Sequence, residues 1–253
     1  MQLRALFLIL KNLIPTNLRP SSYCKRYLLN YTKQSVFSGP FRGMKYLGYS
    51  ITGAYFSKIL GTYELELHET ISNLNRSKFD HAVIVGAGEG YYAAGLSAHL
   101  KIPVVAYERK PEAKQALETL GKLNGLRQLE CRGECKPSSL IQLSNALVLM
   151  DIEGEEVEFL RAGVIDQSQN CYWIIEIHGN EVKRLFLEQV DDRYETSFIS
   201  CRQRKMEDFP IPMSGFPKWL FKRYWFSLMQ EWRGGGSNGS LGWLILEPKP
   251  TEL

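Results

Sequence analysis

The first 63 residues of this 253-residue chain contain no aspartate or glutamate. They carry nine of the 31 lysines and arginines, so the remainder has 22 basic residues against all 27 acidic ones. Basic and acidic residues are therefore not evenly mixed along the chain, which has a basic arm and an acidic body. This asymmetry favours an anionic partner such as phosphate, a membrane surface or nucleic acid, or docking of the arm on the body itself.

A long apolar run is also missing. The run near the start, Ala5–Leu10, is too short for a signal peptide or a membrane span. We expect a short amphipathic helix there, which packs on the body or rests on a membrane surface. The five cysteines are an odd number without framework spacing, which favours reduced thiols and a cytoplasmic protein. Cys131 and Cys135 have no second pair nearby, so zinc is not expected.

From Phe79 onward, apolar segments of strand length alternate with helix-length segments. This order predicts an α/β fold of Rossmann-like type, with a doubly wound, mostly parallel sheet. We expect a basic N-terminal arm and leader segment over residues 1–78 and a catalytic domain over 79–253. The predicted helices are 90–100, 111–123, 137–143, 155–162, 180–189 and an aromatic-rich one over 216–232. Predicted strands end near Val85, Glu108, Arg132, Asp151, His178, Cys201 and Leu246.

The most informative motif lies where the first of these strands ends. Gly86, Gly88 and Gly90 alternate, and an alanine-rich helical stretch follows. This order predicts a strand, a tight turn and a helix, with bare backbone against which a cofactor can lie. A dinucleotide-binding fingerprint needs a small residue at the sixth position, where this chain has Tyr91. The Gly-x-Gly-x-Gly pattern is instead typical of S-adenosylmethionine-dependent methyltransferases of class I.

Acidic residues recur where the predicted strands end. In a parallel sheet, ligands bind beyond the carboxyl ends of the strands. Glu108 follows Gly86 by 22 residues, near the spacing at which a carboxylate binds ribose hydroxyls. Glu134, Asp151 and Glu176 occupy the equivalent ends of later strands. This recurrence predicts one binding site along the edge of the sheet.

Several segments together resemble the FkbM-type branch of class I methyltransferases. The most specific is the Asp-x-Glu-Gly-x-Glu signature at 151–156, which is followed on the next strand by Glu176-Ile177-His178. Residues 85–92, 106–109, 122–126, 39–44 and 60–64 also resemble this branch. The resemblance covers about residues 39–200 and implies methyl transfer from S-adenosylmethionine. One departure is Ile84, which stands where many members carry the aspartate that orders the glycine loop, a role that Glu89 or Glu64 could take over.

The motifs and the resemblance together give a set of candidate residues. The residues expected to bind the cofactor are Tyr63, Glu64, Gly86, Ala87, Gly88, Glu89, Gly90, Glu108, Arg109, Gly133, Glu134 and Asp151. The residues expected to act in catalysis are Asp151, Glu176 and His178. Glu176 and His178 share one face of their strand, so the carboxylate is expected to raise the basicity of the imidazole. A divalent cation such as Mg²⁺, held by Asp151, Glu153, Glu176 or His178, stays an alternative.

The resemblance indicates the reaction better than the substrate. We expect O-methylation of a hydroxyl on a glycan, glycolipid or secondary metabolite. One alternative is a non-catalytic binding module with the same fold in a biosynthetic complex, which Ile84 favours. Another is an RNA methyltransferase, which the basic arm suggests. The chain has no Asn-Pro-Pro-Tyr-type tetrapeptide or known RNA-binding module, so a nucleic acid partner is not expected. Peripheral membrane contact through the arm stays open, and the sequence does not indicate an oligomeric state.

Overall fold

The computed structural model of the chain describes residues 19–190, 192–212, 227–231 and 241–250, together with Pro15 and Tyr224. In these residues one seven-stranded sheet has the order β3-β2-β1-β4-β5-β7-β6. The strands are β1 (His81–Val85), β2 (Val104–Tyr107), β3 (Leu129–Arg132), β4 (Ala146–Met150), β5 (Tyr172–His178), β6 (Tyr194–Ser200) and β7 (Leu241–Pro248). The first five pair in parallel, whereas β7 runs antiparallel between β5 and β6. The predicted Rossmann-like α/β fold is confirmed.

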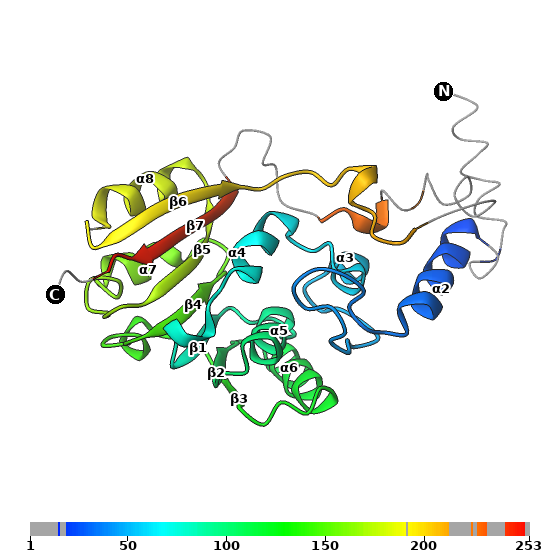
Figure 1. The fold of residues 1–253 in the computed structure, drawn as a ribbon, viewed down its shortest axis with the longest axis horizontal. Helices are drawn as coiled ribbons and strands as arrows, with labels where there is room; N and C mark the ends of the chain where they lie inside the picture. Colours follow the sequence, from blue (N-terminus) through cyan, green and yellow to red (C-terminus); the bar gives the residue numbers. More distant parts are fainter. Residues whose placement is uncertain are drawn as a thin grey trace.

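Helices cover both faces of the sheet (Figure 1). α5 (Tyr91–Leu100) and α6 (Pro111–Leu123) lie on one face, and α7 (Glu156–Arg161) and α8 (Asn180–Gln189) lie on the other. The segment before the sheet contains α2 (Pro20–Thr32), α3 (Tyr55–Leu60) and α4 (His68–Ser72), with 3-10 turns η2 (Leu65–Leu67) and η3 (Arg76–Lys78). Two further 3-10 turns are η4 (Pro137–Ser139) and η5 (Met206–Asp208).

Alternate residues of each strand contribute to two separate cores. On β1, Ala82 and Ile84 belong to one core, and Val83 and Val85 belong to the other. All four are at most 2% exposed, because a central parallel strand is covered on both faces. This explains why the strands read as continuous apolar runs in the sequence rather than as alternating ones.

The leader segment is part of the first core. Phe41, Tyr46, Leu67 and Ile71 are buried among residues of β1, β2, α5 and α6. Gly95 on α5 allows this close approach, since a Cβ there would lie 2.5 Å from the ring of Phe41. Although the division at residue 78 stays a prediction, residues 36–71 share their hydrophobic core with the sheet.

α2 packs away from the sheet, in a smaller cluster. Its Leu28 is buried with Leu60, Ile211 and Met229, which come from α3 and from the segment after β6. α2 is therefore joined both to the leader and to the later part of the chain. No helix among the described residues is long and apolar enough to span a membrane.

Most predicted helices agree with the structure, and one is wrong. Residues 137–143 form only the single turn η4, because Gln142 and Asn145 adopt left-handed backbone conformations, with φ of 66° and 49°, that end any helix. The aromatic-rich helix predicted over 216–232 lies largely outside the described residues. Of the residues described there, Tyr224 and Ser227–Met229 are helical, whereas Gln230 and Glu231 are not.

Candidate functional site

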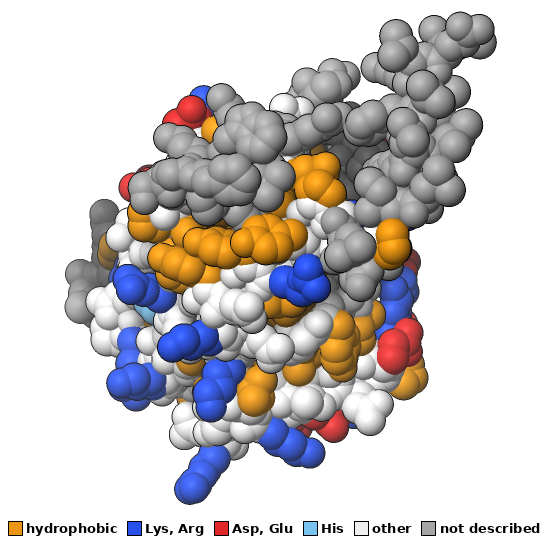
Figure 2. All heavy atoms as spheres, turned by 90° about the vertical axis from the view of Figure 1, so that its right-hand side faces the viewer, with side chains coloured by type: hydrophobic (Ala, Val, Ile, Leu, Met, Phe, Trp, Pro, Cys, Tyr) orange, Lys and Arg blue, Asp and Glu red, His pale blue; other side chains and the backbone are white. Residues whose placement is uncertain are grey.

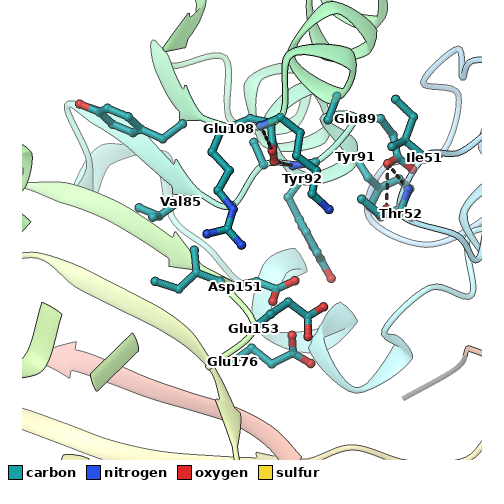
Figure 3. A pocket seen from close by; sticks show the side chains of 18 of the residues that line it. Ile51, Thr52, Val85, Glu89, Tyr91, Tyr92, Glu108, Asp151, Glu153 and Glu176 are labelled. Carbon is teal, nitrogen blue, oxygen red and sulfur yellow. Dashed lines mark hydrogen bonds between the residues drawn. The ribbon is translucent and has the colours of Figure 1, made fainter. Parts of the chain in front are cut away.

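The cavity that gathers most of the candidate residues lies where the strand order reverses, between β1 and β4. Its volume is about 640 Å³, and it is lined from the carboxyl ends of β1, β2, β4 and β5 and from the leader segment. Ligands bind at this place in open α/β sheets because the crossover connections leave in opposite directions and open a crevice. Figure 3 shows Glu108, Glu89 and the group Asp151, Glu153 and Glu176 around this space.

Each glycine of the loop after β1 is needed for a different packing reason. A Cβ on Gly86 would lie 1.7 Å from the carbonyl oxygen of Asp151, where β4 leaves the sheet. On Gly88 it would lie 2.8 Å from the methyl group of Thr52 in the leader, and on Gly90 2.8 Å from Leu117 of α6. All three also have positive φ. Gly86 and Gly88 line the cavity, and the side of Gly88 on which a Cβ would stand is occupied by Thr52.

Glu108 lies at the end of β2, where it supports the glycine loop. Its two carboxylate oxygens accept hydrogen bonds from the backbone N–H of Gly88 at 2.8 Å and of Lys110 at 2.7 Å. A carboxylate has about four acceptor positions, so two remain for a ligand. Next to it, Arg109 is exposed and pairs with Glu155 at 2.9 Å.

The remaining candidates on this side differ in position. Glu134 lines the cavity with an exposed side chain, and the half-buried Cys135 and the buried Phe159 also line it. Gly133 and Gly90 do not line the cavity. Ala87, Tyr63 and Glu64 line it as expected. The predicted cofactor-binding residues thus gather around one space, apart from two glycines.

Glu89 is buried, and its carboxylate turns toward the leader segment (Figure 3). It accepts hydrogen bonds from the Tyr46 hydroxyl at 2.9 Å, from Ser50, and from the backbone N–H and hydroxyl of Thr52 at 3.0 and 2.8 Å. The ammonium of Lys58 lies 2.6 Å away. Burial alone would raise the pKa of Glu89, but Lys58, Ser50 and Thr52 lower it to about 2. Glu89 therefore fastens the leader over the glycine loop.

Asp151 and Glu176 form a pair of carboxyl groups across the other end of the cavity. Burial, followed by the charge and hydrogen bonding of Glu176, raises the pKa of Asp151 well above its usual range. The charges of Glu64 and Glu153 act in the same direction. Oδ1 of Asp151 is buried without a hydrogen-bond partner among the described residues. The raised pKa favours the protonated form of Asp151, with Glu176 as its hydrogen-bond partner.

His178 is oriented by Glu156 rather than by Glu176, which corrects the sequence-based expectation. Nδ1 of His178 lies 3.1 Å from Oε1 of the fully buried Glu156, whereas its Nε2 is 3.6 Å from Glu176 and 3.5 Å from Glu153. Burial lowers the pKa of His178, but the bond to Glu156 and the surrounding carboxylates outweigh burial and raise the pKa overall. The Nε2 side of the ring is thereby directed to the carboxylates that line the cavity.

Glu156 was not among the candidate residues, although it is the last glutamate of the 151–156 signature. Its Oε1 also accepts the backbone N–H of Ile152 at 3.3 Å and of Gly154 at 3.2 Å. It therefore shapes the loop after β4 and fixes His178 at the same time. The signature contained this residue, but only the fold shows which histidine it meets.

A second buried network closes the cavity from the leader side. Arg204 is 3% exposed and binds Glu66 at 2.9 Å and Glu231 at 2.6 Å. Glu231, which lines the cavity, also accepts the backbone N–H of Glu64 at 3.1 Å. The carboxylate of Glu64 accepts a hydrogen bond from Tyr92. No sequence pattern indicated this network, since its members are up to 167 positions apart.

One part of the acidic end has the geometry of a cation site. Ligand atoms of Asp151, Glu153 and His178 all lie within 4.8 Å of one another. Carboxylate oxygens and an imidazole nitrogen suit several divalent cations, and Mg²⁺ favours the oxygens.

The structure was compared with known proteins. It is similar to a precorrin-6y C5,15-methyltransferase from Geobacter metallireducens, with 13% identity, a TM-score of 0.51, and coverage of 81% of this chain and 94% of that one. TYW2 of M. jannaschii, solved with AdoMet, matches with 15% identity, a TM-score of 0.43, and coverage of 74% and 76%. The human methyltransferase 10 domain containing protein matches with 13% identity, a TM-score of 0.44, and coverage of 74% and 82%.

The chain has the class I methyltransferase fold. At 13% identity, the likeness to the precorrin-6y methyltransferase establishes the fold and not the reaction. No protein-family model matches the sequence, and no curated protein matches it significantly. The FkbM-type resemblance therefore belongs to the proposal below.

Proposed function

We propose that the chain is an S-adenosylmethionine-dependent methyltransferase of FkbM type that methylates a hydroxyl group. The observation that carries this proposal is the cavity at the β1–β4 reversal, which has Glu108 on one side and the group Asp151, Glu176 and His178 on the other. A carboxylate for a ribose and an imidazole for an acceptor proton are thus present in one space.

The donor set fits the parts of the cofactor. The free acceptor positions of Glu108 suit two ribose hydroxyls, and Glu134 is an acceptor for the adenine amino group. The unsatisfied Oδ1 of Asp151 and its acidic neighbours suit a positive charge such as a sulfonium. The bound cofactor would supply an activated methyl group, so the chain's own residues need only align the acceptor and remove a proton.

His178 is the residue we assign to proton removal. The raised pKa of Asp151 favours its protonated form, which suits a base less well than His178 does, although the sequence allowed either residue this role. His178 is oriented through Nδ1 by Glu156, which leaves Nε2 to accept a proton from a hydroxyl. Because its pKa is raised above 6.5, His178 is neutral and active as a base only at higher pH. The rate should therefore rise with pH.

For the acceptor, we propose a hydroxyl on a glycan, glycolipid or secondary metabolite, following the FkbM resemblance. The cavity of about 640 Å³ lies within the usual range of volumes for small-molecule sites. Within the same site, a divalent cation at Asp151, Glu153 and His178 is a second assignment of the acidic cluster. Chelator-treated protein that loses activity and regains it with Mg²⁺ would support the cation, and unchanged activity would favour acid–base work.

We also propose peripheral contact of the arm with an anionic membrane surface. Figure 2 shows a face on which Lys and Arg side chains lie below a band of apolar ones, with few acids. On α2, Tyr23 and Tyr31 are 51% and 41% exposed, and Lys25, Arg26 and Lys33 are exposed beside them. The K25Q/R26Q variant should pellet less with anionic vesicles, by about fivefold for each charge. Equal pelleting with zwitterionic and anionic vesicles would contradict the contact.

Calorimetric titration with S-adenosylhomocysteine and S-adenosylmethionine tests the proposed function at its base. We expect binding by the parent chain, and the Glu108→Ala variant should lose roughly 1.5–3 kcal/mol of binding free energy. Glu112→Ala is the matched control, because Glu112 is exposed on α6 and does not line the cavity. If the folded parent binds neither compound at millimolar concentration, the chain is not such an enzyme.

Catalysis is tested with a methyl-labelled cofactor and a panel of glycans, glycolipids and small hydroxyl compounds. With an acceptor in hand, His178→Gln should reduce the rate about 10²–10⁴-fold while cofactor affinity stays unchanged. The pH–rate profile of the parent should have its lower inflection above pH 6.5, and the variant should lose it. Full activity of His178→Gln would assign the base elsewhere.

A further inference from the structure

The cavity is strongly acidic, and its few cations are unequally placed. Among the residues that the structure describes, nine carboxylates line it, against three lysines and arginines: Lys58, Arg109 and Lys110. Arg109 and Lys110 are exposed and follow β2 beside Glu108. Lys58 comes from α3, and its side chain is 3% exposed. A ligand carboxylate that enters this cavity therefore meets one buried cation, in the leader segment.

Lys58 is held rigidly by its neighbours. Its Nζ lies 2.6 Å from Oε1 of Glu89 and 2.6 Å from Oγ1 of Thr52, and 4.8 Å from the centre of the Tyr63 ring. An ammonium has three N–H donors, and among the described residues two of them have these partners. Thr52 also packs on Gly88, which puts Lys58 next to the glycine loop at the wall of the cavity. One N–H donor remains for a ligand.

The charges of S-adenosylmethionine explain why a cation at the position of Lys58 would be useful. S-adenosylmethionine has a carboxylate at the amino-acid end, opposite its adenosine. If Glu108 binds the ribose and the sulfonium faces Asp151, the carboxylate has to avoid the acidic cluster. The leader side of the glycine loop offers the buried cation that it needs.

We propose that Lys58, locked by Glu89 and Thr52, binds the carboxylate of the methionine part of the cofactor. This inference rests on the proposed function, and it adds a cofactor-binding residue from a segment outside the sheet. Glu89 then acts as a positioning residue, because it fixes the ammonium whose remaining N–H donor meets the ligand.

Two ligands that differ only in the carboxylate test the assignment. They are S-adenosylhomocysteine and its decarboxylated analogue, S-adenosyl-3-thiopropylamine. The parent should bind the first about 10–100-fold more tightly, because a charged hydrogen bond is lost in the second. In Lys58→Met this ratio should fall to about one, mainly through weaker binding of S-adenosylhomocysteine. Lys58→Arg should keep a ratio well above one.

The ratio separates binding from folding, since both Kd values come from the same preparation. Lys58→Met leaves Glu89 without its cation, so the double variant K58M/E89Q, which removes both charges, is measured beside it. A parent that binds both ligands equally, or a variant that keeps the parental ratio, would overturn the role of Lys58. A parent that binds neither ligand would instead contradict the proposed function.

Discussion

Two carboxyl groups lie at the β1–β4 reversal, and their pKa values move in opposite directions. Glu89 follows β1 and Asp151 follows β4, and burial by itself would raise both values. Yet the pKa of Glu89 falls to about 2, whereas that of Asp151 rises well above its usual range.

The difference lies in the neighbours. Glu89 is surrounded by an ammonium, three hydroxyls and a backbone N–H, so its charged form is fully satisfied. Asp151 is surrounded by Glu176, Glu64 and Glu153, so its charged form is opposed. A buried carboxylate with a cation and hydrogen-bond donors around it stabilises the fold, whereas one surrounded by other carboxylates is stabilised when a cationic ligand binds. The same cavity thus contains a carboxylate with a structural role and one suited to binding a cation.

The largest expected effect is the loss of stability that follows when the charge of Glu89 is removed. Glu89→Gln should lower the free energy of unfolding by roughly 3–5 kcal/mol, because it leaves Lys58 buried without its partner. The pKa of Glu89 is depressed, so its contribution is complete above about pH 4.5 and is lost as the pH falls toward about 2. Urea unfolding of the parent and the variant at pH 7 and pH 3 measures the difference in unfolding free energy, which should be smaller at pH 3.

A matched control for this loss is Glu188→Gln, which removes the exposed pair with Arg184. It should leave the unfolding midpoint unchanged, as exposed pairs contribute little. If Glu89→Gln unfolds at the same urea concentration as this control, the leader is held by other contacts and the comparison fails.

The next effect concerns Asp151 and the pH dependence of the affinity for S-adenosylmethionine. Binding of the sulfonium near Asp151 should favour the charged form of Asp151 and release its proton. Affinity for S-adenosylmethionine should therefore weaken as the pH falls, by up to about tenfold per pH unit for one released proton. S-adenosylhomocysteine, which has a neutral thioether, should show a flatter curve in the same calorimetric titration. Parallel curves for the two compounds would mean that the sulfonium binds away from Asp151.

Removing the opposed charge should stabilise the protein. A raised folded-state pKa means that Asp151 favours the folded state only at low pH, and that its cost grows as the pH rises above the unfolded value. Asp151→Asn should thus gain about 0.5–2 kcal/mol at pH 8 and nothing near pH 4, while methyl transfer falls. Thermal unfolding at the two pH values gives the sign. A loss of stability at pH 8 would show that the carboxyl group has favourable partners.

The smallest effect is expected from the residues before α2. Deleting residues 1–18 should leave cofactor affinity within about twofold, since the cavity-lining residues that the structure describes begin at Ile51. A deletion that also removes α2 would uncover Leu60 and Met229, which pack on Leu28, and is therefore a less clean test. Calorimetry on the shortened chain measures the affinity, and a tenfold loss would connect the first residues to the site.

The sequence by itself determined the sheet and the edge at which the site lies. Continuous apolar runs of strand length fixed β1, β2, β4 and β5, because parallel strands are buried on both faces. The glycines and acids that follow those runs then had to meet, since the carboxyl ends of parallel strands share one edge. For that reason Glu108, Asp151, Glu176 and His178 could be named before their surroundings were known.

Only the tertiary structure decided which partner each of these groups has. Glu89 meets Lys58, and Glu64 meets Glu231, across 31 and 167 positions of the chain, and no periodicity encodes such pairs. His178 binds Glu156 rather than its strand neighbour Glu176, because α7 brings Oε1 of Glu156 within 3.1 Å of Nδ1 of His178. Residue type sets what a carboxyl group can do, but the charges within a few ångströms set its pKa. Those charges come from segments that only folding brings together.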